Sequence, residues 1–329
     1  MRSYNQMQFE RILVIGLGQL GLPAAKYVKE KGFEVFGFDA SLEAVNRAES
    51  GGIKRAHDFG DYDAYIICIS THSPDNMFSP QTEGILSVAN RISKEAKRDG
   101  ALVSIESTIP RGTSQKVFEI LGHRLHVVHA PHRWYALEEK EHGVNQLRVI
   151  GGVCDCCLKA GMQFYDRQTI EDNNNHNCNN NNAASTIHTN LATLEPSLNT
   201  RMVTYKKSLE IPMHPVSRIE IAETTKIVEN AHRYLQIAFA EELYLYSQAN
   251  NINFPELRDA LNTKWNVNVL EPRDGIGGHC LPKDTRMFLE SSNSIRSRIL
   301  TAAMEVDRNY RTFRAGLNHR LHVEEDHNH

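Results

Sequence analysis

RILVIGLGQLGLPAAKYVKEKGFEVFGFD, residues 11–39, places a short apolar run before three closely spaced glycines, and an acidic residue after a second apolar run. The β-branched run Arg11–Ile15 is typical of a buried parallel strand. A helix is predicted next, with Pro23 near its start, and a second strand over 34–38 leads to Asp39. The order of strand, glycine turn, helix, strand and acidic residue predicts a dinucleotide-binding fold.

Each glycine of this turn has a distinct predicted task. Gly16 allows the tight turn, Gly18 leaves room for a pyrophosphate, and Gly21 lets the helix pack closely on the strand. The phosphates would rest on the N–H groups that begin the helix. Asp39 would accept hydrogen bonds from the adenosine ribose and repel a 2′-phosphate, so the predicted cofactor is NAD rather than NADP.

Strands and helices continue to alternate after this unit. Predicted strands cover residues 64–69, 101–105, 125–128 and 146–150, and predicted helices cover residues 83–97, 112–121 and 158–165. The alternation predicts an α/β, Rossmann-type, doubly wound and mostly parallel sheet over residues 1–167.

Polar side chains stand where these predicted strands end. They are Ser70, Thr71, Glu106, Thr108 and His132. Ligands of such sheets bind beyond the carboxyl ends of the strands, so these residues are candidates for lining one crevice. Alternatively, the serines and threonines only cap the following helices.

Two stretches between the predicted sheet and the rest of the chain have unusual compositions. Residues 153–157 read VCDCC, and a metal site is one interpretation. Because no second cysteine or histidine pair at ligand spacing accompanies them, we favour surface or core thiols. Residues 168–210 are rich in asparagine and are predicted to be a disordered insertion, in which His176 and Cys178 are bystanders.

Residues 211–329 are predicted to form an all-helical domain around one long helix, 217–250. Its apolar residues lie on several faces, which predicts packing against a second subunit in a homodimer. Lys226 and Asn230 are four residues apart and therefore share a face. They could hold a substrate oxygen together, or they could be two solvated surface residues.

The stretch DGIGGHCLPKD, Asp274–Asp284, carries a cysteine directly after a run of glycines. A thiol on a loop, with Lys283 and Asp284 a few residues away, is a common arrangement for a reactive thiolate. The alternative is a glycine turn followed by a free Cys280 that merely packs.

Composition and charge exclude several classes of function. A net charge of −3 over 329 residues gives no electrostatic reason to expect nucleic acid or an anionic membrane as partner. No apolar run approaches about 18 residues, and the first residues do not resemble a signal peptide. Six cysteines in a chain of this length do not predict a disulfide framework, so we expect a cytoplasmic location.

Taken together, four motifs resemble the UDP-glucose/GDP-mannose dehydrogenase family, the nucleotide-sugar 6-dehydrogenases. They are GLGQLGLP from Gly16, ESTIPRGT from Glu106, ETTKIVEN from Glu223 and GIGGHCLPKD from Gly275. Their order and spacing cover most of the chain apart from the Asn-rich stretch.

The resemblance implies a two-step oxidation of a sugar C6 alcohol to a carboxylate, with two NAD used in turn. Cys280 would attack the intermediate aldehyde, and Lys226 with Asn230 would stabilise the oxyanion. Asp284 would assist proton transfer with an ordered water, and Thr108 would position substrate and water. Gly16, Gly18, Gly21, Asp39, Thr71, Glu106 and Lys283 would hold the cofactor.

Two departures from the family pattern affect these expectations. Many members carry Pro-Glu where this chain has Pro131-His132, so His132 could replace that glutamate as the base. The third domain that usually covers the nucleotide end of the substrate is not expected here. Local candidates for substrate contacts are Arg133, Trp134, Arg273 and Gly277.

Three functions stay open at this point. The first is a UDP-sugar 6-dehydrogenase, for which His279 leans toward N-acetylamino sugars and the Leu-Pro-Lys-Asp segment is shared with the UDP-glucose type. The second is an NAD-binding dimer without turnover, acting in regulation or interaction. The third is a β-hydroxyacid dehydrogenase, in which Lys226 is the general acid/base and Cys280 is incidental.

Overall fold

The structure, a computed structural model, describes residues 8–72, 79–133, 143–166, 207–278, 280–291 and 297–326. The chain divides into two compact units. The first, here called the sheet unit, comprises Met1–Ser70, Glu83–Ser107 and Gly112–Ala222. The second, here called the helical unit, comprises Thr71–Thr82, Thr108–Arg111 and Glu223–His329. Except for its last four residues, the predicted insertion 168–210 lies outside the described part of the chain.

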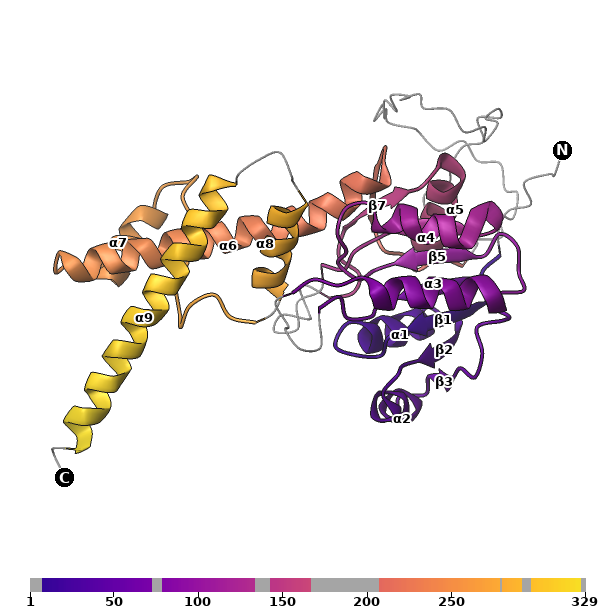
Figure 1. Cartoon of the computed structure of the whole chain (residues 1–329), viewed down its shortest axis with the longest axis horizontal. Coiled ribbons are helices and arrows are strands. Elements are labelled where there is room, and N and C mark those ends of the chain that lie inside the picture. Colours follow the sequence, from indigo (N-terminus) through magenta and orange to yellow (C-terminus); the bar gives the residue numbers. More distant parts are fainter. Residues whose placement is uncertain are drawn as a thin grey trace, which may run out of the picture. The chain divides into compact units, whose positions relative to one another are not determined.

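The sheet unit is built on one sheet, to which the described residues contribute eight strands in the order β3-β2-β1-β4-β5-β6-β7-β8 (Figure 1). The strands are β1 (Arg11–Ile15), β2 (Glu34–Phe38), β3 (Lys54–Arg55), β4 (Ala64–Ile67), β5 (Leu102–Ile105), β6 (His126–His129), β7 (Arg148–Gly152) and β8 (Met213–Val216). Neighbouring strands are parallel, apart from the antiparallel pair β6 and β7. The predicted Rossmann-type sheet is therefore confirmed.

Helices connect the strands and cover the sheet (Figure 1). They are α1 (Gly21–Glu30), α2 (Leu42–Ser50), α3 (Glu83–Glu95), α4 (Thr113–Leu121), the short 3₁₀ helix η1 (Gly122–Arg124) and α5 (Asp155–Tyr165). Because strands of such a sheet are covered on both faces, β4 and β5 are buried along their whole length. The predicted apolar runs thus form the core.

Four elements of this unit were not predicted from the sequence. They are α2, β3, η1 and β8. β3 has two exposed residues, and β8 contains Pro215, so neither carries the apolar pattern of a buried strand. β8 pairs in parallel with β7 and thereby extends the sheet beyond the undescribed stretch.

The helical unit contains four helices among its described residues (Figure 1). They are α6 (Ile219–Ala249), which begins in the last residues of the sheet unit, α7 (Phe254–Asn262), α8 (Cys280–Glu290) and α9 (Arg298–Asp326). α6 confirms the single long helix predicted over 217–250. α8 begins at Cys280 itself, so the thiol opens a helix instead of standing on the loop before it.

In the described part of the chain, no helix combines the length and apolar character needed to cross a membrane.

Candidate active site

The glycine turn after β1 leaves no room for side chains at two of its three glycines. Gly16 has φ +92, and a Cβ there would lie 2.5 Å from the carbonyl oxygen of Cys68. A Cβ on Gly21 would lie 1.7 Å from the carbonyl oxygen of Gly16. Around Gly18, by contrast, a Cβ would meet nothing within 4 Å. The turn is thus held tightly at both ends and open in the middle, where a pyrophosphate needs space.

Asp39, directly after β2, ties this turn to the neighbouring strand. One carboxylate oxygen accepts a hydrogen bond from the Leu17 N–H at 2.7 Å, and the other accepts from the Ser41 N–H at 2.8 Å. Each carboxylate oxygen has a further lone pair that a ribose hydroxyl could use. The residues at this edge therefore fit an adenine dinucleotide that carries an unphosphorylated ribose.

Glu106, directly after β5, is the centre of a buried polar cluster in the sheet unit. Its Oε2 lies 2.5 Å from His132 Nε2 and 3.0 Å from Arg148 Nη1. Tyr165 donates a hydrogen bond to the other carboxylate oxygen. Cys68 Sγ lies 3.9 Å from both Glu106 Oε2 and His132 Nε2. Only 2% of the Glu106 side chain is exposed, so these contacts largely replace water around the carboxylate.

The charges in this cluster keep Glu106 ionised. Burial by itself would raise the pKa of Glu106, but Arg148 and His132 outweigh it and hold that pKa at about 2. Burial and the nearby Glu106 raise the pKa of the Cys68 thiol well above its usual value. Burial also raises the pKa of Tyr165, which stays protonated and donates a hydrogen bond to the carboxylate. Glu106 therefore joins β5 to β7 and α5 as a buried anion.

Arg148 and Tyr165 are part of this cluster, and neither was predicted from the sequence as a site residue. Arg148 is 1% exposed and also donates to the carbonyl of Val144 at 2.8 Å. An arginine inside the apolar run 146–150 is the signal that could have revealed it, because a fully buried guanidinium needs a carboxylate partner.

In the helical unit, a chain of polar contacts joins five of the predicted site residues. Lys283 Nζ donates to Thr71 Oγ1 at 3.1 Å, and Thr71 Oγ1 donates to the carbonyl of Thr108 at 2.7 Å. Lys283 Nζ also lies 2.7 Å from Asp284 Oδ1. Asn230 donates from its amide nitrogen to Asp284 Oδ2. The contacts bring together α6, α8 and the two short segments 71–82 and 108–111.

Cys280 opens α8, the helix that also carries Lys283 and Asp284. Its side chain is exposed, whereas Lys283 and Asp284 are buried. Desolvation by the surrounding protein, followed by the charge of Asp284, raises the pKa of Cys280, and Lys283 and Lys226 act in the opposite direction. The resting thiol is therefore protonated at neutral pH.

The loop before Cys280 is fastened to α9. Asp307 accepts a hydrogen bond from the Ile276 N–H at 2.9 Å, and Arg311 donates to the Ile276 carbonyl. Tyr310 donates to the Arg273 carbonyl at 2.6 Å, and Arg314 lies 3.0 Å from an Asp274 carboxylate oxygen.

The four residues of α9 that hold this loop were not identified from the sequence. They are Asp307, Tyr310, Arg311 and Arg314. Their i, i+3, i+4 and i+7 spacing places them on one face of a helix, and this polar stripe is the signal that could have found them.

Models of known families match both parts of the chain. A model described as the UDP-glucose/GDP-mannose dehydrogenase family, central domain, matches residues 220–309, which include Lys226, Asn230, Cys280 and Asp284. A model of the NAD binding domain of 6-phosphogluconate dehydrogenase matches residues 11–131. These matches confirm the predicted resemblance to the UDP-glucose/GDP-mannose dehydrogenase family, the NAD cofactor and the oxidoreductase class.

Individual relatives of this dehydrogenase family extend the match over nearly the whole chain. A UDP-N-acetyl-D-mannosamine dehydrogenase from Methanococcus maripaludis is 25% identical over 94% of this chain and 67% of the relative. The enzyme of that name from Escherichia coli K12 is 28% identical over 92% of this chain and 70% of the relative. The solved structure of UDP-D-MAnNAc dehydrogenase from Pyrococcus horikoshii aligns with a TM-score of 0.72 at 24% identity, covering 96% of this chain and 72% of that chain.

The residues predicted to contact the substrate lie in different surroundings in this structure. Arg133 donates from its guanidinium to the Leu147 carbonyl at 2.9 Å. Arg273 and Gly277 are exposed. Trp134 and His279 lie outside the described residues. Binding of substrate by Arg133, Arg273 and Gly277 stays a prediction.

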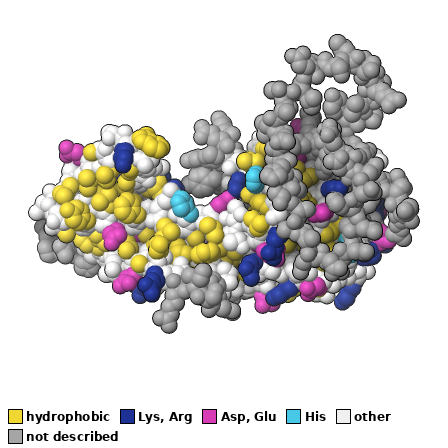
Figure 2. Space-filling view, turned by 90° about the horizontal axis from the view of Figure 1, so that it is seen from above, with side chains coloured by type: hydrophobic (Ala, Val, Ile, Leu, Met, Phe, Trp, Pro, Cys, Tyr) yellow, Lys and Arg dark blue, Asp and Glu magenta, His cyan; other side chains and the backbone are white. Residues whose placement is uncertain are grey.

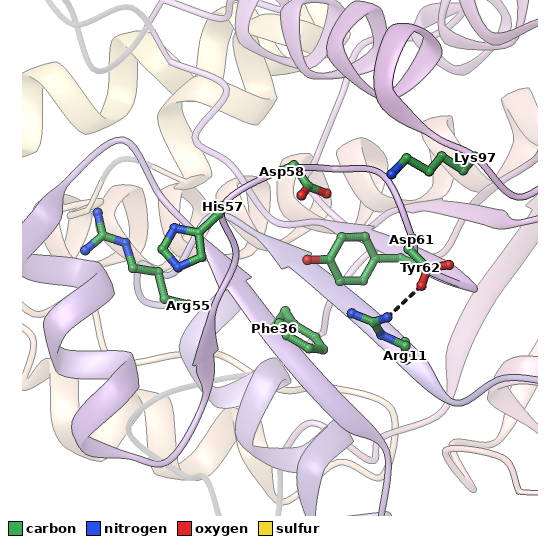
Figure 3. Close-up of a pocket in the computed structure, with 8 residues that line it drawn as sticks. All are labelled: Arg11, Phe36, Arg55, His57, Asp58, Asp61, Tyr62 and Lys97. Atoms are coloured by element: carbon green, nitrogen blue, oxygen red, sulfur yellow. Dashed lines mark hydrogen bonds and ion pairs between the residues drawn. The ribbon is translucent and has the colours of Figure 1, made fainter.

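A separate hollow of about 230 Å³ lies in the sheet unit, and Figure 3 shows the eight side chains that line it. Arg11 begins β1 and Tyr62 precedes β4, so both stand at the amino ends of their strands, away from the glycine turn. Arg11 forms an ion pair with Asp61 at 2.6 Å and stacks over Phe36 and Tyr62, with its guanidinium carbon 5.0 and 5.6 Å from the two ring centroids. These contacts stabilise the edge of the sheet and do not belong to the nucleotide crevice.

Proposed function

We propose that this dehydrogenase oxidises the C6 alcohol of a UDP-N-acetylamino sugar to the carboxylate, using two NAD in turn. The family supports a nucleotide-sugar substrate, and the names of the relatives support the N-acetylamino class. UDP-glucose is the second candidate substrate, because the family name includes it.

One observation carries the proposal. Cys280, Lys283 and Asp284 begin a single helix, and Asn230 on α6 and Thr71 are joined to them by direct hydrogen bonds within one compact unit. A nucleophile next to buried donors and a carboxylate is what covalent aldehyde oxidation requires.

The first oxidation removes a hydride and a proton from the C6 alcohol and gives an aldehyde. Bound NAD accepts the electron pair as a hydride in each oxidation. Thr108 and the side chains linked to it position the sugar, and Asn230 with Lys226 holds the C6 oxygen. One N–H of the Asn230 amide is engaged by Asp284, and its second N–H provides the donor for that oxygen.

The second oxidation uses the thiol. The Cys280 sulfur adds to the aldehyde carbon, and a proton replaces the lost thiol proton on the aldehyde oxygen, which gives a thiohemiacetal. Loss of a second hydride and a proton converts the thiohemiacetal to a thioester, and water then releases the carboxylate and restores the thiol. Lys226 and Asn230 stabilise the oxyanion at each stage.

Asp284 is the proposed proton carrier for the water that cleaves the thioester. Its carboxylate is fixed by Asn230 and Lys283, so it would meet the water in a constant orientation. His132 is the weaker candidate for this base, because its Nε2 is held by Glu106 and only 3% of the side chain is exposed.

The test is a panel of UDP- and GDP-sugars incubated with purified protein and NAD, with products identified by mass spectrometry. We expect two NADH for each uronate with a UDP-N-acetylamino sugar, because each oxidation removes two electrons. The Cys280→Ser variant should stop before the second oxidation and yield at most one NADH per sugar. Full uronate production by that variant would remove the thiol from the mechanism.

The two other functions predict different results in the same panel. An NAD-binding dimer without turnover would bind NAD in a calorimeter and give no NADH with any sugar. A β-hydroxyacid dehydrogenase would oxidise a small hydroxy acid once and would be unaffected by Cys280→Ser. The match of residues 220–309 to the central domain of this family favours the nucleotide-sugar reaction over both.

We also propose that the protein acts as a homodimer through α6. Val228, Phe239 and Tyr246 on this helix are 38%, 58% and 55% exposed. Hydrophobic side chains also gather over the helical unit in Figure 2. Because monomers seldom expose a row of large apolar side chains, a second copy of the chain is the proposed cover. The cytoplasmic location stays a prediction.

A further inference from the structure

Four side chains that bind soft metals come together in the sheet unit, beside the amino end of β6. Cys154, Cys156 and Cys157 stand at the start of α5, and His123 lies in η1, just before β6. One ligand atom from each of the four residues lies within 4.8 Å of all the others. The second, distant ligand position that the VCDCC stretch lacks in the sequence is therefore supplied by the fold.

The distances match a tetrahedral site that needs little rearrangement. Cys154 Sγ lies 2.9 Å from Cys156 Sγ and 3.3 Å from Cys157 Sγ. His123 Nε2 lies 3.1 Å from Cys156 Sγ and 3.6 Å from Cys154 Sγ. Zinc–sulfur bonds of about 2.3 Å in a tetrahedron separate two sulfurs by roughly 3.8 Å, so the cluster would open by less than about 1 Å.

The backbone around the sulfurs provides groups that stabilise negative charge. The Val127 N–H donates to Cys157 Sγ at 3.3 Å. Cys154 is the N-cap residue of α5, and Cys156 and Cys157 lie in its first turn, where the helix dipole stabilises negative charge.

The cluster lies at the edge of the sheet opposite the cofactor. β7 runs antiparallel to β6, and its last residue, Gly152, pairs with Val128. The Val153 N–H then donates to the Val127 carbonyl, so α5 begins beside the amino end of β6. The glycine turn and Glu106 follow the carboxyl ends of the parallel strands β1 and β5. A metal held by the cluster would therefore act on the fold and not on the substrate.

We infer that His123, Cys154, Cys156 and Cys157 form a structural Zn²⁺ site that fastens η1 and the start of β6 to the start of α5. Three sulfurs and one imidazole fill all four positions of a tetrahedral zinc ion, which is the ligand set of structural sites. Three thiolates and Zn²⁺ leave one net negative charge, which the amino end of α5 stabilises.

The first experiment measures zinc in the full-length protein, purified without an affinity histidine tag, after dialysis against metal-free buffer. We expect one Zn²⁺ per chain by mass spectrometry of the metal. Replacement by Co²⁺ should produce the strong sulfur-to-cobalt absorption and the visible bands of a tetrahedral thiolate site. Removal of the ion with a chelator should lower the melting temperature, and Zn²⁺ alone should restore it.

Variants separate this site from other metal ligands of the chain. Cys156→Ser and His123→Gln should each weaken Zn²⁺ binding at least about tenfold, measured in competition with a chromophoric chelator. Cys280→Ser, which changes a thiol in the helical unit, should leave zinc binding unchanged.

Two results would overturn the inference. One is zinc binding of wild-type strength in both Cys156→Ser and His123→Gln, because the ion would then lie elsewhere. The other is metal-free native protein with two fewer free thiols than the reduced, unfolded chain, because the cysteines would then form a disulfide.

Discussion

The single residue on which the proposed reaction depends is Cys280, and its ionisation can be measured directly. Desolvation by the surrounding protein and the charge of Asp284 raise the pKa of this thiol, so less thiolate is present at neutral pH than for an ordinary cysteine. We expect iodoacetamide to modify Cys280 slowly at neutral pH and faster as the pH rises through that elevated pKa. Peptide mass spectrometry at a series of pH values measures the rate for this cysteine alone.

Asp284→Asn and Lys283→Met provide opposite controls for this prediction. Removing the carboxylate charge should lower the pKa of Cys280 and speed its alkylation at neutral pH. Removing the ammonium charge should slow it, because Lys283 favours the thiolate. If both variants were modified at the wild-type rate, these charges would not control the thiol.

The ionised carboxylate of Glu106 makes the stability of the sheet unit depend on pH in acid. The pKa of Glu106 is about 2 in the folded protein, below its ordinary value, so its contribution to stability is fully present above about pH 4.5. It is lost as the pH falls toward 2, at roughly 1.4 kcal/mol for each pH unit. Glu106→Gln should therefore destabilise the sheet unit at neutral pH by about 3 kcal/mol or more, since Arg148 would keep a buried charge.

Urea unfolding followed by circular dichroism at several pH values tests this expectation. The stability difference between wild type and Glu106→Gln should narrow as the pH falls from about 4.5 to 2. Glu119→Gln, which changes an exposed glutamate of the same unit, should show no such trend. A constant difference at all pH values would mean that Glu106 is not the ionised centre of its cluster.

At the scale of one element, α6 carries a buried carboxyl that opposes folding at high pH. Burial, and then Asp307, raises the pKa of Glu241 to about 8. Between pH 4.5 and 8 the folded unit keeps a proton that the unfolded chain has lost, so stability falls by roughly 1.4 kcal/mol per pH unit. Glu241→Gln should remove this slope and stabilise the helical unit at pH 8.

Glu242→Gln is the matched control for this element, because the neighbouring glutamate is exposed on the same helix. It should leave the pH dependence of stability unchanged when unfolding of both variants is followed in urea. A Glu241→Gln protein that loses stability at pH 8 would contradict the assignment of a neutral carboxyl to this position.

Features that depend on residue spacing along the chain were predicted from the sequence, whereas features that depend on contacts between distant segments were not. The glycine turn, the long helix and the Cys280 motif were predicted because each is local and depends on spacing along the chain. The cluster of His123 with Cys154, Cys156 and Cys157 was not predicted, since His123 precedes Cys154 by 31 residues and the pairing of β6 with β7 brings them together. The ion pair between Arg148 and Glu106 was not predicted for the same reason, because it joins residues at two different strands of the sheet.

At the scale of the whole molecule, the exposed apolar residues of α6 form one stripe. Val228, Phe239 and Tyr246 are separated by 11 and 7 residues, which is close to whole turns of a helix and places them on one face. Residues 228–246 span about 27 Å at 1.5 Å per residue. A stripe of this length, repeated on a second copy by two-fold symmetry, would form a self-complementary interface.

We therefore expect the wild-type chain to sediment as a dimer and Phe239→Asp to sediment as a monomer, because a carboxylate in the apolar stripe would be desolvated on association. Leu42→Asp places the same charge at an exposed leucine of α2 in the sheet unit, 57% exposed, and should remain dimeric. Sedimentation velocity at several protein concentrations measures both variants. A monomeric wild type, or a dimeric Phe239→Asp, would show that this stripe serves some other contact.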